Sequence, residues 1–252
     1  MKMVISPAKS LQFDSQLPSI KFTIPNFSEE ANLINGLLKK KTSKALSELM
    51  HISDKLAKLN WERNQSFNSQ GSSNKRPAIF TFNGDVFQGL DPYTLSSEKI
   101  NQMQNQLRIL SGLYGILKPL DLIQPYRLEM GTNFLIGKHK NLYDFWKDKT
   151  TQQLNLEIEE GELFVNLASN EYFNVIDVER LEAKIVTPQF KDFKNGKLKI
   201  ISFFAKKARG MMVRHLVDID AKTIEDIKAF NSDGYSYSAD ETADPLKPVF
   251  TR

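Results

Sequence analysis

Helix-forming and strand-forming patterns are interspersed along the 252 residues without a regular strand–helix repeat, and this order limits the fold most. A regular alternation would predict a doubly wound or barrel protein, whereas an irregular mixture predicts an α+β protein. No internal repeat is visible, and the only linker-like stretch is the polar segment 65–77, expected to be a mobile loop. We therefore expect one compact α+β domain of mixed strands and helices over residues 1–252.

Apolar periodicity and capping residues place the elements within that domain. Asn195-Gly196 between two apolar segments is a strong hairpin signal. Strands are expected at 2–5, 78–82, 163–167, 184–190, 197–204 and 248–250. Helices are expected over 29–64 with a break near His51, from Ser96 or Ser97 to about 110, over 141–156, and from the end of the hairpin to about 217.

Residue usage excludes several classes of site. The chain has no cysteine, which rules out disulfides, thiolate metal sites and iron–sulfur clusters. Its three histidines, His51, His139 and His215, form no HxH or HxxxH pair, so no metal site and no cofactor are predicted. No apolar run is long enough to span a bilayer, and Pro7 interrupts the first residues too early for a secretory signal. We expect a cytoplasmic monomer with no membrane partner.

Charge is concentrated in the last third of the chain. From Lys184 to Arg214, nine basic residues oppose one acid, a net charge of +8. From Asp218 to Asp244, eight acids oppose two lysines. Such a separation creates a strong local field that attracts anions such as nucleic acid, although a solvated lysine-rich surface is the alternative explanation.

The break near His51 resembles a helix-hairpin-helix, a motif that holds a DNA phosphate with exposed backbone N–H groups. His51 and Ser53 stand where the motif has two glycines, which crowds the phosphate and puts backbone binding in doubt. Ile52 keeps the apolar centre, and Lys55 and Lys58 supply charge. An ordinary pair of packed helices is the alternative.

The segment 108–132 is rich in glycine, proline, arginine and tyrosine. Gly112 and Gly115 flank Tyr114, and no GKS or GKT follows, so it is not a P-loop. Ordered loops of this composition often line sites, but a buried connector with arginines satisfying carbonyl groups is equally compatible.

The helix after the hairpin has a basic face. On a helical wheel Gly210 lies among Lys206, Lys207 and Arg214, opposite the apolar Met211 and Met212. Because glycine lowers helix stability by roughly 1 kcal/mol relative to alanine, we expect Gly210 to admit an anion close to the backbone. Close packing against another element is the alternative.

Together these segments resemble the YaaA family of bacterial peroxide-stress proteins. The matching segments are ISPAKSLQF at 5–13, FNGDVFQGL at 82–90, 108–132, VNLASNEYF at 165–173, TPQFKDFKNG at 187–196, IISFFAKKARGMM at 200–212 and PVFTR at 248–252. The resemblance implies an unusual α+β fold with a basic cleft and a helix-hairpin-helix, DNA binding, and a role against hydrogen peroxide in which unincorporated iron is lowered. Phe82 and Phe87, where relatives often have tyrosine, and the long loop 65–76 depart from the family pattern.

The first functional hypothesis is a DNA-binding protein of the peroxide response that recognises the DNA backbone and shape. No base-reading element is visible. The candidate DNA- or anion-binding residues are Lys9, Arg108, Arg127, Lys191, Lys206, Lys207, Arg209, Gly210 and Arg214.

The second hypothesis is an enzyme that acts on a nucleotide or another phosphorylated small molecule, with no catalytic residue assignable. The candidate pocket-lining residues are Asn83, Asp85, Ser111, Tyr114, Tyr126, Glu129, Asn166, Ser169, Glu171 and Tyr172. A third hypothesis, direct iron sequestration, is disfavoured by the scattered histidines and missing cysteines.

Overall fold

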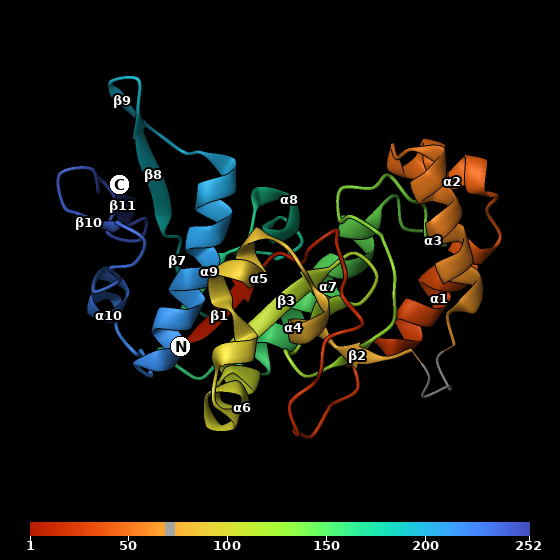
Figure 1. Cartoon of the computed structure of the whole chain (residues 1–252), viewed down its shortest axis with the longest axis horizontal. Coiled ribbons are helices and arrows are strands. Elements are labelled where there is room, and N and C mark those ends of the chain that lie inside the picture. The colour runs from red at the N-terminus through yellow and green to blue at the C-terminus, as the bar shows by residue number, and fades with distance from the viewer. Residues whose placement is uncertain (69–73) are drawn as a thin grey trace.

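The computed structural model describes residues 1–68 and 74–252. Its main sheet has five strands in the order β4-β3-β1-β6-β7 (Figure 1). Their bounds are β1 (Lys2–Ile5), β3 (Leu107–Ser111), β4 (Gly115–Leu117), β6 (Leu163–Leu167) and β7 (Lys184–Val186). Strand β1 pairs in parallel with both β3 and β6, β6 pairs in parallel with β7, and only β4 joins antiparallel.

The expected mixture of helices and strands is confirmed, but the largely parallel sheet was not predicted. Between β1 and β3 the chain runs for about a hundred residues through several short helices, so no regular strand–helix unit is visible in the sequence. The centre of the sheet is the core of the molecule. Met3, Val4 and Ile5 of β1 are all buried, as a strand covered on both faces requires.

Helices surround this sheet. Their bounds are α1 (Ser28–Lys39), α2 (Ser43–Met50), α3 (Asp54–Ser66), α4 (Ala78–Thr81), α5 (Asp85–Leu90), the 3-10 turn η1 (Pro92–Thr94), α6 (Ser97–Gln106), α7 (Leu142–Asn155), α8 (Asn170–Phe173), α9 (Ser202–Asp218) and α10 (Ile224–Lys228). The predicted start of α6 is confirmed, since the Ser96 side chain accepts from the backbone N–H of Lys99. Asn141 caps α7 in the same way.

A second sheet has the order β10-β11-β8-β9. Its strands are β8 (Gln189–Lys194), β9 (Lys197–Lys199), β10 (Ser236–Ser238) and β11 (Val249–Thr251), and a further pair joins β2 (Arg76–Pro77) to β5 (Leu122–Ile123). Asn195 (φ 54°) and Gly196 (φ 73°) both have the positive φ of a tight hairpin, so the predicted turn is confirmed.

Some predicted elements differ. Residues 78–82 form the short helix α4 rather than a strand, because Ala78 to Thr81 pack into the core from every side and a short apolar run carries no period. The helix from Ser96 ends at Gln106, where β3 begins, and β9 ends at Lys199 before α9. The predicted loop 65–77 is shortened by the end of α3 and by β2, and its centre lies outside the described residues. No helix in the described ranges is long and apolar enough to cross a bilayer.

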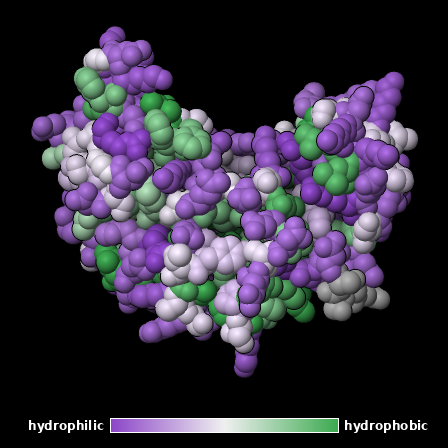
Figure 2. Space-filling model, viewed as in Figure 1, coloured by the Kyte–Doolittle hydropathy of each residue, from purple (hydrophilic) through white to green (hydrophobic). Residues whose placement is uncertain are grey.

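One face of the molecule is hollowed between two projections (Figure 2). One projection is formed by β8, β9 and the start of α9, and the other by α1, α2 and α3 (Figure 1). The short helices α5 and α8 lie between them in this view.

Candidate functional site

A pocket of about 310 Å³ opens where the parallel strands β1 and β6 end. Because the chain continues from β1 to β3 on one side and returns to β6 on the other, β1 lies at the point where the strand order reverses. Open parallel sheets bind their ligands in the crevice at that point, beyond the carboxyl ends of the strands. The lining residues are Ser6, Pro7, Ala8, Lys9, Ser10, Asn83, Gly84, Asp85, Val86, Phe87, Ser169, Glu171, Tyr172, Lys206 and Arg209.

Two serines join the loops that follow β1 and β6. The Ser6 Oγ donates to Ser169 Oγ at 3.2 Å and accepts from the backbone N–H of Ser169 at 2.9 Å. Gly84 approaches the first of these loops closely, since an added Cβ would lie 2.9 Å from Ala8 Cβ. These contacts hold the base of the pocket in one arrangement.

Helix α9 supplies two of the cations that line the pocket, beside Lys9 from the loop after β1. Arg209 and Lys206 both line it, and neither has a hydrogen bond or an ion pair within the described residues. Burial lowers the pKa of the Arg209 guanidinium from its ordinary value, which marks a charge that has lost part of its water. The pocket therefore contains positive charge without a counter-ion from the described chain.

Carboxylates lie on the other walls. Asp85 begins α5 and has no side-chain partner among the described residues. The Glu171 Oε1 accepts from the backbone N–H of Gly131 at 3.1 Å. The pocket thus contains both cations that can bind an anion and carboxylates that can accept hydrogen bonds.

Glu129 pairs with two of the predicted cations. Its oxygens lie 2.6 Å from Lys9 Nζ and 2.8 Å from an Arg127 nitrogen. Burial alone would raise the pKa of Glu129, but Lys9 and Arg127 outweigh it and hold the pKa below its usual range. Because Lys9 and Arg127 share Glu129 as a counter-ion, they are weaker anion-binding candidates than Arg209, which has no ion pair within the described residues.

Four predicted pocket residues are buried in the core instead. The Ser111 Oγ and Tyr126 Oη are 2.7 Å apart, and Ser111 also accepts from the backbone N–H of Tyr114. Burial raises the pKa of both tyrosines well above the usual value. Asn166 is buried too and accepts from the backbone N–H of Ala168. Their polar atoms therefore join internal networks, whereas Asn83, Asp85, Ser169, Glu171 and Tyr172 do line the pocket.

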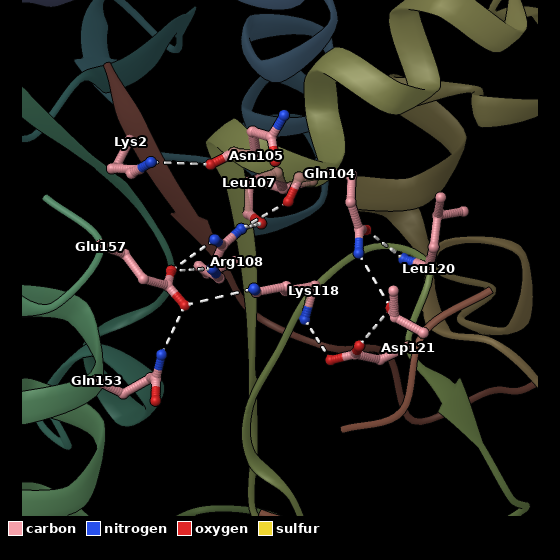
Figure 3. Close-up of polar contacts among 11 residues, drawn as sticks. Lys2, Gln104, Asn105, Leu107, Arg108, Lys118, Leu120, Asp121, Gln153 and Glu157 are labelled. Atoms are coloured by element: carbon pink, nitrogen blue, oxygen red, sulfur yellow. Dashed lines mark hydrogen bonds and ion pairs between the residues drawn. The ribbon is translucent and has the colours of Figure 1, made fainter. Parts of the chain in front are cut away.

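The prediction that Arg108 binds an external anion is wrong. Its side chain is 4% exposed and its Nε donates to Glu157 at 2.5 Å (Figure 3). It also donates to the carbonyl groups of Gln104 and Leu107. A buried arginine must be paired, and these contacts use its donors. Nearer the surface, Lys191 pairs with Glu241 at 3.1 Å, and Arg214 with Asp218 at 2.8 Å.

Gly210 does not lie on an exposed face, so the ligand-approach interpretation is wrong. A Cβ at this position would lie 1.8 Å from the carbonyl oxygen of Val86 in α5. The same crossing excludes a side chain at Gly89, whose Cβ would lie 2.1 Å from the carbonyl oxygen of Lys207. The two glycines allow the backbones of α5 and α9 to touch. Gly210 therefore serves close packing against another element, the alternative given in the sequence analysis.

Helices α2 and α3 are joined by a short turn at His51 to Ser53, at the place where the sequence resembles a helix-hairpin-helix. His51 adopts the left-handed conformation (φ 51°) that the related motif gives to glycine. The Ser53 side chain caps α3 by accepting from the backbone N–H of Leu56, and Ser47 Oγ donates to the Ile52 carbonyl oxygen at 2.6 Å. Lys55 and Lys58 are exposed on α3.

The sequence reasoning missed Ser6 and Gly84. Both lie in segments that carry the family resemblance, but only Lys9, Asn83 and Asp85 were selected there. The available signal was position: Ser6 directly follows a buried strand, where parallel sheets place binding groups. Among the described residues, no group of three or more histidines, aspartates and glutamates is arranged to hold a metal ion.

Comparisons with known proteins agree along nearly the whole chain. A family model described as "Peroxide stress protein YaaA" matches residues 1–241. A UPF0246 protein of Flavobacterium psychrophilum is 59% identical over 240 residues, and one of Flavobacterium johnsoniae is 57% identical, each covering 95% of both chains. A UPF0246 protein of Hahella chejuensis is 47% identical over 255 residues, covering 100% of this chain and 99% of its own.

Proposed function

The chain belongs to the peroxide stress protein YaaA family, and from that premise we propose that it serves the response to hydrogen peroxide by binding DNA. The DNA would lie across the hollowed face between the two projections (Figure 2). Recognition would rest on the phosphate backbone, which supplies most of the affinity of sequence-independent binding.

The observation that carries this proposal is the set of lysines without partners on the elements that border the hollow. Lys194, Lys197 and Lys199 on β8 and β9 are exposed, and none has an ion pair within the described chain. Lys206 and Lys207 of α9 are likewise unpaired among the described residues. Such charges are available to displace counter-ions from DNA.

The opposite projection supplies a second row of charge. Lys55 and Lys58 of α3 are exposed and have no ion-pair partner in the described ranges. They follow the turn at His51, where the chain adopts the left-handed conformation without the glycines of a phosphate-binding hairpin. We propose that this element contacts DNA through its lysines rather than through bare backbone N–H groups.

Fluorescence anisotropy with a labelled duplex tests the proposal. Lys194→Gln with Lys197→Gln should weaken binding several-fold at low salt, because two phosphate contacts are lost. The matched control is Lys222→Gln with Lys247→Gln, which removes two lysines already paired with Asp220 and Asp244. Equal effects of the two double variants, or no measurable duplex binding by the parent chain, would reject DNA binding across this face.

A further inference from the structure

The unpaired arginine of the pocket indicates what kind of ligand fills it. Arg209 is partly desolvated, lines the cavity and has no partner within the described residues. A desolvated guanidinium is unfavourable until an anion pairs with it. Its planar fork suits a phosphate in a bidentate geometry, and Lys206 adds a second positive charge on the same helix, one turn before Arg209.

The pocket also contains a group that repels phosphate. Asp85 lines the same cavity as Arg209, yet the two form no ion pair with each other. A carboxylate without a partner accepts hydrogen bonds from hydroxyl or amino groups. The ligand that satisfies both walls therefore has an anionic end and a hydroxyl-bearing end.

The size and the position of the pocket narrow the choice of ligand further. At about 310 Å³ the cavity lies at the small end of the range for small-molecule sites, roughly 300–1,000 Å³. It also lies at the carboxyl ends of β1 and β6, where the strand order reverses. A sugar phosphate fits this description, and a dinucleotide does not.

We propose that this pocket binds a pentose phosphate group, with the phosphate on Arg209 and Lys206 and a sugar hydroxyl donating to Asp85. The group belongs either to a free mononucleotide or sugar phosphate, or to the phosphorylated end of a nucleic acid strand. This site goes beyond the proposed DNA binding and does not depend on it.

Calorimetry on the full chain with ribose 5-phosphate, AMP and adenosine tests the anionic end. Ribose 5-phosphate and AMP should bind, and adenosine should bind at least about tenfold more weakly, because charge-assisted bonds to phosphate are lost. Arg209→Gln should lower the affinity for ribose 5-phosphate and for AMP by a similar factor, and Arg209→Lys should lower both affinities less. The matched control is Arg180→Gln, whose guanidinium pairs with Asp148 at the surface.

Asp85→Ala tests the other end and separates this site from general attraction of anions. The variant should bind ribose 5-phosphate several-fold more weakly, because a hydroxyl acceptor is lost. Its affinity for inorganic phosphate should be unchanged or higher, because a carboxylate that repels phosphate is gone. Binding of duplex DNA should stay intact in this variant, so the pocket and the DNA proposal fail independently. Thermal melting confirms that each variant is folded.

An oligonucleotide with a 5′-phosphate, compared with the same strand without it, distinguishes the two sources. Competition with AMP by the phosphorylated strand alone assigns the site to strand ends, and no competition assigns it to a free ligand. The proposal is overturned if neither ribose 5-phosphate nor AMP binds at millimolar concentration. It is also overturned if Arg209→Gln behaves as Arg180→Gln, or if Asp85→Ala affects ribose 5-phosphate and inorganic phosphate alike.

Discussion

Gly210 lies where the backbones of α5 and α9 touch, and this contact determines what a substitution there does. Gly210→Ala should lower the free energy of unfolding by at least roughly 1–3 kcal/mol, because the new methyl group meets a carbonyl oxygen 1.8 Å away that belongs to a helix. Thermal or urea unfolding measures the loss.

Gly36 in α1 is the matched control, since nothing lies within 4 Å of a Cβ built there. Gly36→Ala should raise the stability by roughly 0.5–1 kcal/mol through helix propensity alone. A Gly210→Ala protein as stable as the parent would contradict the close helix crossing.

We expect Arg108 to contribute to stability rather than to binding, because its donors are used within the chain. Arg108→Met should cost about 3–5 kcal/mol of folding free energy, because it leaves Glu157 partly buried without its main partner. Lys118, 3.9 Å from Glu157, compensates only weakly (Figure 3). Chemical denaturation gives the value.

Two comparisons separate this effect from a general loss of charge. Arg180→Met removes a surface arginine paired with Asp148 and should cost at most about 1 kcal/mol. Adding Glu157→Leu to Arg108→Met should recover part of the loss, because no buried carboxylate is then left without its arginine. A mild Arg108→Met effect together with weakened DNA binding would instead return Arg108 to the binding residues.

At the scale of elements, the sequence predicts those features that depend on neighbouring residues, such as helix caps and tight turns. The cap at Ser96 and the Asn195-Gly196 turn are confirmed, because each depends on residues within a few positions. The helix α4 and the crossing at Gly210 were mispredicted, because burial from distant segments decides them. No pattern in the sequence indicates that β1 pairs with both β3 and β6, so the position of the pocket could not be derived.

The same distinction applies to the candidate site. Lys206, Arg209, Asp85 and Glu171 were selected by type and do line the pocket. Ion pairs exclude Arg108 as an anion-binding residue and make Lys9 a weaker candidate. These pairs join residues 49 and 120 positions apart, and one sequence does not show such contacts.

The hairpin between α2 and α3 should contribute less to DNA binding than α9. Ser53 caps α3 with its own side chain, and no glycine bares the backbone at this turn, so only Lys55 and Lys58 are available. Lys206→Ala with Lys207→Ala should therefore weaken duplex binding more than Lys55→Ala with Lys58→Ala. Anisotropy at one salt concentration compares the pairs, and the reverse order would show that the hairpin is the main contact.

At the scale of the whole molecule, the two ends of the parallel sheet differ in structure. The carboxyl ends of β1 and β6 open into the pocket, and α5 and α8, which both contain lining residues, lie between the two projections (Figure 1). At the amino end, the Met1 amino group pairs with Glu162 at 2.6 Å. Lys194, Lys197 and Lys199, which have no ion pair within the described residues, lie on β8 and β9 beside the hollowed face.

This distribution predicts how DNA binding responds to salt. Each lysine that neutralises a phosphate releases a counter-ion, so the logarithm of the binding constant should fall linearly with the logarithm of salt concentration. Removing Lys194 and Lys197 together should reduce the steepness of that line by about 1.8, at roughly 0.9 per contact. The affinity should differ little between unrelated duplex sequences, because the contacts are to phosphates. Affinity that is constant from low to moderate salt, or a strong preference for one sequence, would mean that base contacts and not these lysines hold the DNA.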